Sequence, residues 1–527
     1  MKREDLLAPE HYNLVTEIEQ FANGEGNIAV HYEDAEGLVK DITYDELILQ
    51  ANRLANVFQQ HGLQKGDVMI VMVPRLIEAY ITYIAAIKCG LVVIPSSEML
   101  RTKDIEYRIE HSSAKAIVSY EPYIEQFDDV HNLHEVQQFV IGHAHEPWVP
   151  LLDEMKDASS EFENVDTLST DMVFLSYTSG TTGNPKAAVH THSWAYAHLR
   201  TAATHWLGIE KGDLVWATAS PGWQKWIRSP FLSVLGTGAT GFVYNSRFDA
   251  ETYLNLIQER KINVLCCTPT EYRVMAKAEN LESYDLSSLH SAVSAGEPLN
   301  AEVINQFKSI FDLDVRDGYG QTESTLLIGT MKGMLAKIGS MGKPTPGNIV
   351  SVVDDFGQPC PPNVVGDIAV HKSTPALFKE YLNDTERTQA QYRGDYFITG
   401  DQGKVDGDGY FWFEGRSDDI IISSGYTIGP FEVEDALVKH PDVRECAVVG
   451  SPDELRGAVV KAFVILKNKE RANEAGFIKE LQNFSKKLTA PYKYPRLIEF
   501  VEELPKTASG KIRRVELREQ EFKGKVK

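Results

Sequence analysis

Short apolar runs alternate with longer amphipathic segments over about the first 320 residues of the 527-residue chain, and this alternation is what most constrains the fold. The runs have the length of buried strands, whereas Ala250–Arg260 and Ala301–Ile310 have the spacing of amphipathic helices. Repeated strand and helix predict an α/β fold with doubly wound sheets, and the length predicts more than one sheet. The predicted strands are Val68–Val73, Leu91–Ile94, Met172–Tyr177, Leu214–Ala217, Ile262–Cys266 and Ala292–Ser294.

The pattern changes after Gly347. From there to Trp412, short apolar runs are separated by Gly, Pro and Asp residues, which predicts a small β-rich subdomain. After Arg416 a compact α/β unit is predicted. Its helices and strands are expected at Phe431–Lys439, Cys446–Val449, Ala462–Leu466 and Phe477–Leu488.

Composition excludes several classes of protein. The chain has 53 basic and 75 acidic residues, and a net charge of −22 argues against a nucleic acid as the main partner. The most hydrophobic region, from residue 68 to 95, is broken by charged residues and a proline, so no membrane span is predicted. No signal-peptide pattern follows Met1, and the five cysteines are expected to be reduced packing thiols. We therefore expect a soluble, cytoplasmic protein.

A loop rich in hydroxyl residues and glycines follows the predicted strand Met172–Tyr177. A helical pattern begins near Thr191, so a strand-to-helix loop is predicted. Glycines let backbone N–H groups approach phosphates, hydroxyls donate hydrogen bonds and a lysine adds positive charge. A polyphosphate site is one interpretation and a flexible surface loop is the other, while the Walker A pattern does not fit. The loop reads Tyr177-Thr178-Ser179-Gly180-Thr181-Thr182-Gly183-Asn184-Pro185-Lys186.

Four more motifs follow this loop in order. They are Tyr319-Gly320-Gln321-Thr322-Glu323, Tyr396-Phe397-Ile398-Thr399-Gly400-Asp401, Gly415-Arg416-Ser417-Asp418-Asp419 and Pro505-Lys506-Thr507-Ala508-Ser509-Gly510-Lys511. With the loop, they resemble the core motifs of the adenylate-forming superfamily, which contains acyl-CoA synthetases, adenylation domains and luciferases. The resemblance extends from about Thr43 to Arg514 and covers nearly the whole chain.

The resemblance implies a domain organisation and a reaction. A large N-terminal domain, residues 1–417, would bind ATP and an acid, and a small mobile α/β domain, residues 418–527, would turn about a hinge at Asp418. The implied enzyme is an acyl-CoA synthetase. It joins a carboxylic acid to AMP with release of pyrophosphate and then forms acyl-CoA, with ATP, Mg²⁺ and CoA as cofactor and co-substrates.

The same resemblance assigns residues to the phosphates and the reacting groups. Glu323 matches the carboxylate near magnesium, Thr322 would donate to the α-phosphate, and Lys511 would contact the carboxylate and the α-phosphate during adenylation. Thr178, Glu323 and Lys511 are thus the predicted catalytic residues. A lone Glu or Lys outside such motifs is usually a solvated surface charge. The predicted phosphate-binding residues are Thr178, Ser179, Gly180, Thr181, Thr182, Gly183 and Lys186.

Adenine and ribose have their own predicted residues. Tyr319 matches the aromatic residue that stacks on adenine, Asp317 the residue that recognises its exocyclic amine, and Asp401 the carboxylate that accepts the ribose hydroxyls. A core tyrosine and a structural Asp–Arg pair are the alternatives. The remaining predicted nucleotide-binding residues are Gly296, Glu297, Pro298, Gly318, Gln321 and Arg416.

The C-terminal domain carries one departure from the family pattern. Gly425 matches a position beside the pantetheine channel of CoA. Related acyl-CoA synthetases usually have arginine where this chain has Thr427, so no role is transferred to that residue. The family also implies that Lys511 is acylated and deacylated by partner enzymes, which would switch its charge. A homo-oligomer is a further possibility that the sequence leaves open.

Two positions concern the acid. Acetyl- and propionyl-CoA synthetases have tryptophan where this chain has Gly320, so a deeper acyl pocket is predicted. The segments Ser220–Trp226 and Tyr492–Arg496 resemble the medium-chain acyl-CoA synthetases, in which Trp223 would line the acyl site or else be a core residue. We expect a short branched or medium-chain acid. The alternatives are an enzyme that loads a carrier protein, a luciferase-like oxygenase and a nucleotide-binding regulator without turnover.

Overall fold

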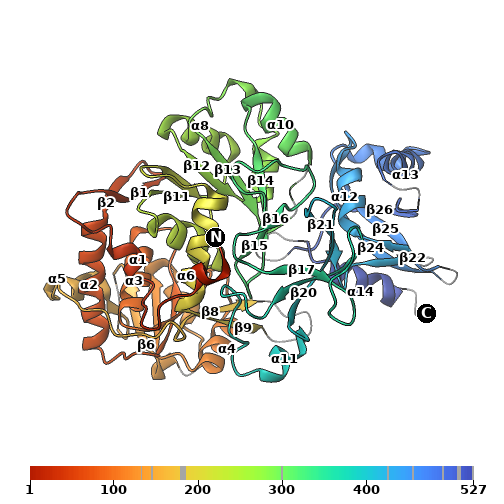
Figure 1. Ribbon diagram of the computed structural model, residues 1–527. Coiled ribbons are helices and arrows are strands. Elements are labelled where there is room, and N and C mark those ends of the chain that lie inside the picture. Colours follow the sequence, from red (N-terminus) through yellow and green to blue (C-terminus); the bar gives the residue numbers. More distant parts are fainter. Residues whose placement is uncertain are drawn as a thin grey trace.

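The computed structural model describes residues 1–131, 133–143, 146–178, 185–297, 299, 301–423, 426–453, 456–489, 492–506 and 512–524, with the backbone alone at 426, 427, 457, 523 and 524. Within these residues the strands form four sheets. Figure 1 shows the elements after about residue 420, in blue, as a separate group beside the larger N-terminal part.

The N-terminal sheet has the strand order β7-β6-β5-β3-β4-β8-β9. Its strands are parallel except β9, which is antiparallel to β8. All side chains of β3 (Val68–Met72) are buried, as expected of a parallel strand that is covered on both faces. The other strands are β4 (Val92–Pro95), β5 (Ala116–Tyr120), β6 (Gln137–Ile141), β7 (Val149–Pro150), β8 (Met172–Thr178) and β9 (Lys186–Thr191).

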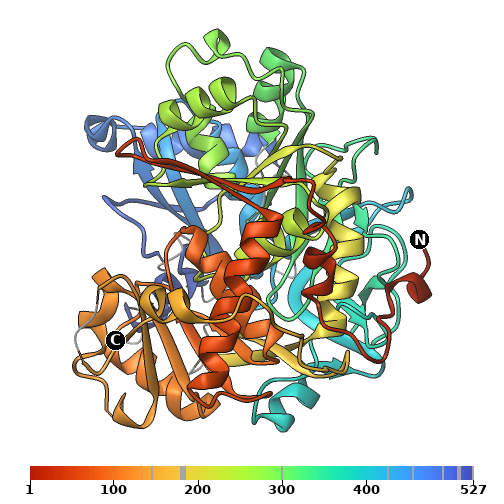
Figure 2. The same ribbon diagram turned by 90° about the vertical axis from the view of Figure 1, so that its left-hand side faces the viewer.

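The central sheet has the strand order β16-β15-β14-β13-β12-β10-β11-β1-β2. The strands from β14 to β1 are parallel, and the pairs β14–β15, β15–β16 and β1–β2 at the two edges are antiparallel. The red N-terminal strands therefore lie beside later strands of this sheet, as Figure 2 shows. The strands are β1 (Ile28–Asp34), β2 (Val39–Thr43), β10 (Leu214–Ala217), β11 (Thr240–Asn245), β12 (Val264–Cys267), β13 (Ser291–Ala295), β14 (Val315–Gly320), β15 (Leu326–Gly329) and β16 (Lys343–Pro344).

Helices α2 (Tyr44–Gln60), α3 (Ile77–Lys88) and α6 (His192–Ala202) fill the space between these two sheets. One apolar cluster joins them to Val71 of the N-terminal sheet and to Val243 of the central sheet. Helix α2 begins where Thr43 Oγ1 accepts a hydrogen bond from the Glu46 N–H at 3.1 Å, which is an N-cap. Helix α4 (Thr102–Ser112) packs on the outer face of the N-terminal sheet, and α8 (Ala250–Arg260), α9 (Pro269–Met275) and α10 (Ala301–Phe311) pack on the outer face of the central sheet.

Two smaller sheets follow. The β-rich sheet contains β17 (Val350–Val353), β18 (Gly366–His371), β19 (Tyr392–Arg393), β20 (Tyr396–Val405) and β21 (Phe411–Arg416). The C-terminal sheet contains β22 (Ile421–Ser423), β23 (Tyr426–Ile428), β24 (Val443–Asp453), β25 (Gly457–Leu466) and β26 (Leu497–Phe500). The remaining helices are α1 (Thr16–Glu19), α5 (Leu151–Asp157), α7 (Gln224–Trp226), α11 (Thr385–Ala390), α12 (Pro430–Val438), α13 (Phe477–Leu488) and α14 (Arg514–Gly524).

The predicted α/β architecture with several sheets and a β-rich subdomain is confirmed. One local prediction is wrong, because the Ser/Thr/Gly loop does not connect a strand directly to a helix. Residues 186–191 form β9, which pairs with β8 so that Lys186 lies opposite Thr178. Helix α6 begins only after that strand. The small apolar residues of β9 are buried, so this segment extends the sheet.

Two expectations from composition can be compared with the structure. All five cysteines lie within the described ranges, are free thiols, and four of them are buried. None of the helices in those ranges is long and apolar enough to cross a membrane.

Candidate active site

The predicted site residues gather where parallel strands of both large sheets end. Strand β8 ends at Thr178, β13 at Ala295 and β14 at Gly320. Doubly wound sheets bind ligands at the carboxyl ends of their strands. The motifs from β20 and β21 reach the same region through contacts with the segment that follows β14. Segments far apart in the sequence thus form one polar cluster.

Lys186, Glu323 and Tyr381 form a compact charged group. Lys186 Nζ lies 2.8 Å from Glu323 Oε1 and donates to the Tyr381 hydroxyl at 2.6 Å. That hydroxyl donates to the same carboxylate oxygen at 2.7 Å. Burial works to raise the pKa of Glu323, but Lys186 and Tyr381 outweigh it and the pKa is lowered. Glu323 is therefore an ionised carboxylate although its side chain is buried.

The Thr178 hydroxyl lies at the start of the Ser/Thr/Gly loop. Its oxygen is buried and, within the described residues, has no hydrogen-bond partner. Buried hydroxyls are normally paired, so an unpaired one beside Lys186 fits a ligand that supplies an acceptor or donor. The predicted phosphate-binding residues Ser179, Gly180, Thr181, Thr182 and Gly183 lie outside the described residues.

Asp401 of β20 is held by two residues of the segment around the end of β14. Its Oδ2 accepts hydrogen bonds from the Tyr319 hydroxyl and from Gln321 Nε2, both at 2.6 Å. Burial raises the pKa of Asp401, and Arg416 opposes this shift. Arg416 Nε is 3.6 Å from Asp401 Oδ1 and 3.8 Å from Asp418 Oδ1. The structural pair considered as the alternative is therefore present, and it connects the predicted ribose carboxylate to the predicted hinge.

Asp317 lies in β14, and Gly296 directly follows the neighbouring strand β13. Asp317 accepts a hydrogen bond from the Gly318 N–H at 2.8 Å, and burial raises its pKa to about 7. Gly296 has φ +113°, a conformation that L side chains rarely adopt. Glu297 forms an ion pair with Arg273 of α9 at 2.9 Å. Pro298 lies outside the described residues.

Sequence reasoning missed a polar layer beneath the segment 321–324. The buried Arg228 guanidinium donates to the Ser324 carbonyl at 2.8 Å, and also to the carbonyl of Gln321. Its Nη2 also donates to Gln224 Oε1 at 2.9 Å. His190 Nε2 donates to the Thr322 carbonyl at 2.7 Å, which fixes the backbone next to Glu323. Gln224 lies in the Ser220–Trp226 segment, but no motif includes Arg228, His190 or Tyr381, so no sequence pattern pointed to them.

The two predicted acyl-site residues differ in their surroundings. Trp223 is 37% exposed, so the alternative of a core tryptophan does not hold. At Gly320 a Cβ atom would lie 2.1 Å from the Thr325 carbonyl oxygen. The close approach of β14 and the chain entering β15 therefore requires glycine, whatever the size of the acyl pocket. A tryptophan at 320 needs a different backbone.

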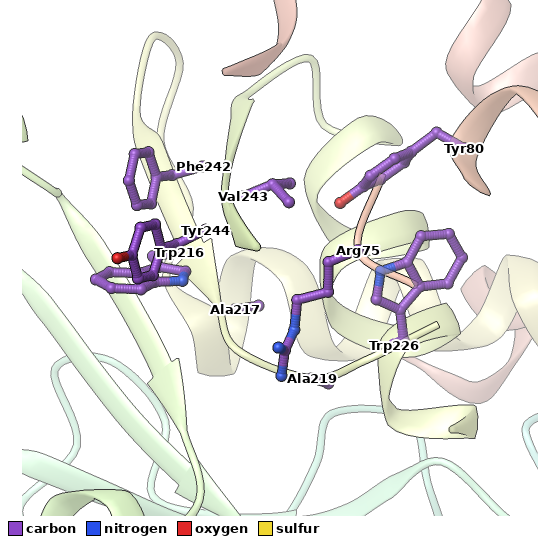
Figure 3. Close-up of a pocket in the computed structure, with 9 residues that line it drawn as sticks. All are labelled: Arg75, Tyr80, Trp216, Ala217, Ala219, Trp226, Phe242, Val243 and Tyr244. Carbon is purple, nitrogen blue, oxygen red and sulfur yellow. The ribbon is translucent and has the colours of Figure 1, made fainter. Parts of the chain in front are cut away.

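A small cavity lies between β10, β11, α3 and α7 (Figure 3). Its free space is about 10 Å³, which is room for about one water molecule. Arg75 lies in its wall and donates to the Thr218 carbonyl at 2.8 Å, while its buried Nε has no partner among the described residues. The size suits a water molecule and not an acyl chain. The lining residues are Arg75, Tyr80, Trp216, Ala217, Ala219, Trp226, Phe242, Val243 and Tyr244.

Two predicted residues of the C-terminal domain, Gly425 and Lys511, lie outside the described residues and stay predictions. Of Thr427, to which no role was assigned, only the backbone is described. Asp418 is placed by the structure. It lies 3.5 Å from Arg518 of α14, which also pairs with Asp419.

A magnesium ion is compatible with this donor set. Mg²⁺ is commonly bound by one or two carboxylates together with substrate phosphates and waters. Glu323 is a buried, ionised carboxylate whose two close contacts are both made by Oε1. The described residues contain no group of three or more His, Cys, Asp or Glu side chains that could hold a metal without a phosphate.

A charged group and a buried carboxylate beside the strand ends of both large sheets are typical of the ligand site of an α/β enzyme. Comparison with known proteins gives the family. The pattern described as "AMP-binding enzyme" matches residues 18–382, and "AMP-binding enzyme C-terminal domain" matches residues 432–511. The chain belongs to this AMP-binding, adenylate-forming enzyme family.

Its relatives are acyl-CoA ligases. The chain is 60% identical to the uncharacterized acyl-CoA ligase YtcI of Bacillus subtilis, over 99% of this chain and 98% of that protein. It is 41% identical to the mitochondrial acyl-coenzyme A synthetase ACSM3 of Mus musculus, over 98% of this chain and 91% of that protein. The anthranilate CoA ligase AuaEII, solved with anthranoyl-AMP, superposes with a TM-score of 0.91 at 28% identity and covers 99% of both chains. A benzoate CoA ligase from Burkholderia xenovorans superposes with a TM-score of 0.85 at 28% identity, over 96% of this chain and 100% of that one.

Proposed function

We propose that this protein is an AMP-forming acyl-CoA ligase that activates a short branched or medium-chain carboxylic acid. The observation that carries the proposal is the group formed by Lys186, Tyr381 and Glu323 beside the unpaired hydroxyl of Thr178. A lysine and a hydroxyl at the two ends of a Ser/Thr/Gly loop suit the phosphates of ATP. The close acyl-CoA ligase relatives support the class.

In the first half-reaction a carboxylate oxygen of the acid would attack the α-phosphorus of ATP, and pyrophosphate would leave. Lys186 would neutralise phosphate charge, Asp401 would accept the ribose hydroxyls and Asp317 would accept from the adenine amine. These residues hold the two anions together, and positioning and electrostatics account for most of such a rate enhancement. Lys511, by resemblance to the family, would bridge the carboxylate and the α-phosphate in the transition state.

Glu323 is the residue that would hold magnesium. When bound, Mg²⁺ supplies charge neutralisation on the phosphate oxygens. The protein's own part is to keep the Glu323 carboxylate ionised and fixed, which Lys186 and Tyr381 do through Oε1.

In the second half-reaction the thiol of CoA would attack the acyl carbon of the adenylate, and AMP would leave. The proposal includes a turn of residues 418–527 about Asp418 between the two half-reactions. Asp418 contacts Arg416 of the large domain and Arg518 of α14 in the small domain, and this position between the two supports a hinge there.

The test is product detection by mass spectrometry with ATP, magnesium and CoA. The acids would be straight-chain acids of about two to sixteen carbons, branched short acids and benzoate. A thioester together with AMP supports the ligase, and the preferred acid defines the pocket. Acyl-adenylate without thioester would instead indicate a carrier-protein acceptor or an effect of Thr427. Absence of turnover with every acid would favour the alternative of a nucleotide-binding regulator without catalytic activity.

Three finer features belong to the same proposal. Acylation of Lys511 would remove its charge and stop adenylation, so full activity of the acetylated enzyme would contradict that regulation. A homo-oligomer is proposed only as a state to be measured by light scattering. A cytoplasmic location is proposed from the composition and the free cysteines, although the ACSM relatives are named as mitochondrial.

A further inference from the structure

Lys225 is a half-buried lysine that reaches the end of β13. Its Nζ donates to the carbonyl of Ala295 at 2.8 Å, and within the described chain it forms no ion pair. Glu297, two residues beyond Ala295, is paired with Arg273 at 2.9 Å. Within the described residues, the half-buried Lys225 therefore donates to a neutral backbone carbonyl and not to a carboxylate.

The place of Lys225 brings this ammonium to the predicted acyl site. It lies in α7, two residues after Trp223, and reaches the carboxyl end of β13. Ala295 pairs with Gly318 of β14, two residues before Gly320. The preceding residue, Gln224, contacts His190 at 2.8 Å. Gln224 and Lys225 therefore reach the end of β13 and His190, whose Nε2 donates to the Thr322 carbonyl next to Glu323.

The neighbouring charges do not neutralise Lys225. Arg228, one turn later, is itself a buried cation that binds backbone carbonyls. Asp317 is close enough for Lys225 to lower its pKa, yet burial still raises that pKa to about 7, so the carboxyl carries only part of a negative charge near neutral pH. A half-buried ammonium in this setting favours an acceptor oxygen from a ligand, because desolvating it against an apolar chain is unfavourable.

We propose that Lys225 makes this enzyme select carboxylic acids that carry an acceptor oxygen, such as a ketone or a second carboxylate, away from the reacting carboxyl group. The inference rests on the proposed ligase function and names its substrate class. Lys225 donates a charge-assisted hydrogen bond to that oxygen while the reacting carboxylate lies against the α-phosphate. An apolar acid of equal length leaves the ammonium without this partner, and hydrogen-bonding sites discriminate strongly against such analogues.

The test compares acids of about four to eight carbons in matched pairs, with and without an oxo or a distal carboxylate group, for example heptanoate and 6-oxoheptanoate. The readout is kcat/KM for thioester formation. The wild type is expected to prefer the oxygen-bearing member of at least one pair by about 10- to 100-fold, the factor that corresponds to one hydrogen bond to a charged group. Lys225→Met is expected to abolish or reverse this preference, and Lys225→Arg is expected to keep part of it. Lys211→Met, a substitution of an exposed lysine ahead of β10, is the matched control and should leave the ratio unchanged.

The outcomes separate this inference from the proposed function. A wild type that makes thioesters but prefers the apolar member of every pair overturns the inference alone, even if Lys225→Met fails to fold. The same holds if Lys225→Met keeps the wild-type ratio or lowers kcat/KM equally for both members. Absence of adenylate and thioester with every acid overturns both.

Discussion

Acidification from about pH 8 to about pH 5.5 is expected to destabilise the folded protein through three buried histidines. Desolvation lowers the pKa of His190 and of His198 to about 3 and that of His192 to about 4, all from 6.5. His192 Nδ1 accepts from the Leu14 N–H at 3.1 Å, and His198 contacts the Thr325 hydroxyl at 2.5 Å and the Arg228 carbonyl at 3.0 Å. These histidines are neutral in the folded state.

The direction of this change in stability follows from the linkage between proton binding and folding. A histidine whose pKa is lowered by folding contributes stability that is complete above 6.5 and is lost as the pH falls, because the unfolded chain then binds the proton more tightly. At about pH 5.5 each histidine costs about 1.4 kcal/mol, and the three together about 4 kcal/mol. Asp317 acts in the opposite direction. Its raised pKa stabilises the folded state, as the pH falls through 7, by about 2 kcal/mol at about pH 5.5. The expected net loss from these four groups is about 2 kcal/mol.

Urea unfolding at several pH values between 8 and 5.5, followed by tryptophan fluorescence, measures this loss. Trp194 stacks on His198 at a centroid distance of 5.5 Å, so the signal includes a probe next to a titrating group. His198→Gln is expected to reduce the loss by about 1.4 kcal/mol, and Asp317→Asn to increase it by about 2 kcal/mol. Equal free energies of unfolding at both ends of the range for all three proteins would refute the reasoning, as would identical pH slopes in the two variants.

Three other predictions concern single contacts. Tyr381→Phe keeps the ring over Lys186 but removes the hydroxyl bonded to Glu323, so kcat/KM for ATP in pyrophosphate exchange should fall about 10-fold, and an unchanged value would contradict the role of this contact. Lys88 is almost fully buried and paired with Glu19; Lys88→Met should lower the free energy of unfolding by about 3 kcal/mol in urea titration, with partial recovery in Lys88→Met/Glu19→Gln. Arg518→Gln releases Asp418 and Asp419 from α14, so it should change the rate of thioester formation from preformed adenylate by a few-fold more than the rate of adenylation. Equal changes in the two rates would argue against the hinge at Asp418.

The sequence by itself determined the local elements and the segments that contain the site. The strand Leu214–Ala217 and the helices Ala250–Arg260 and Phe477–Leu488 have the predicted bounds, because the spacing of apolar residues decides which face of an element is buried. Motif order along the chain pointed to the family that the comparisons then established.

Only the tertiary structure decided which of these segments meet. Tyr381 is 58 residues from Glu323 and 195 from Lys186 in the sequence, yet it bonds to both. It does so because the segment between β18 and β19 pairs with Ala188 of β9. Periodicity also did not show that β9 would add an antiparallel strand to β8, or that Thr325 would approach Gly320 too closely for any side chain. Contacts of this kind depend on strand order and on the layering of sheets. The spacing of apolar residues shows which face of a helix or strand is buried. The element that packs against that face is determined only when the whole core packs.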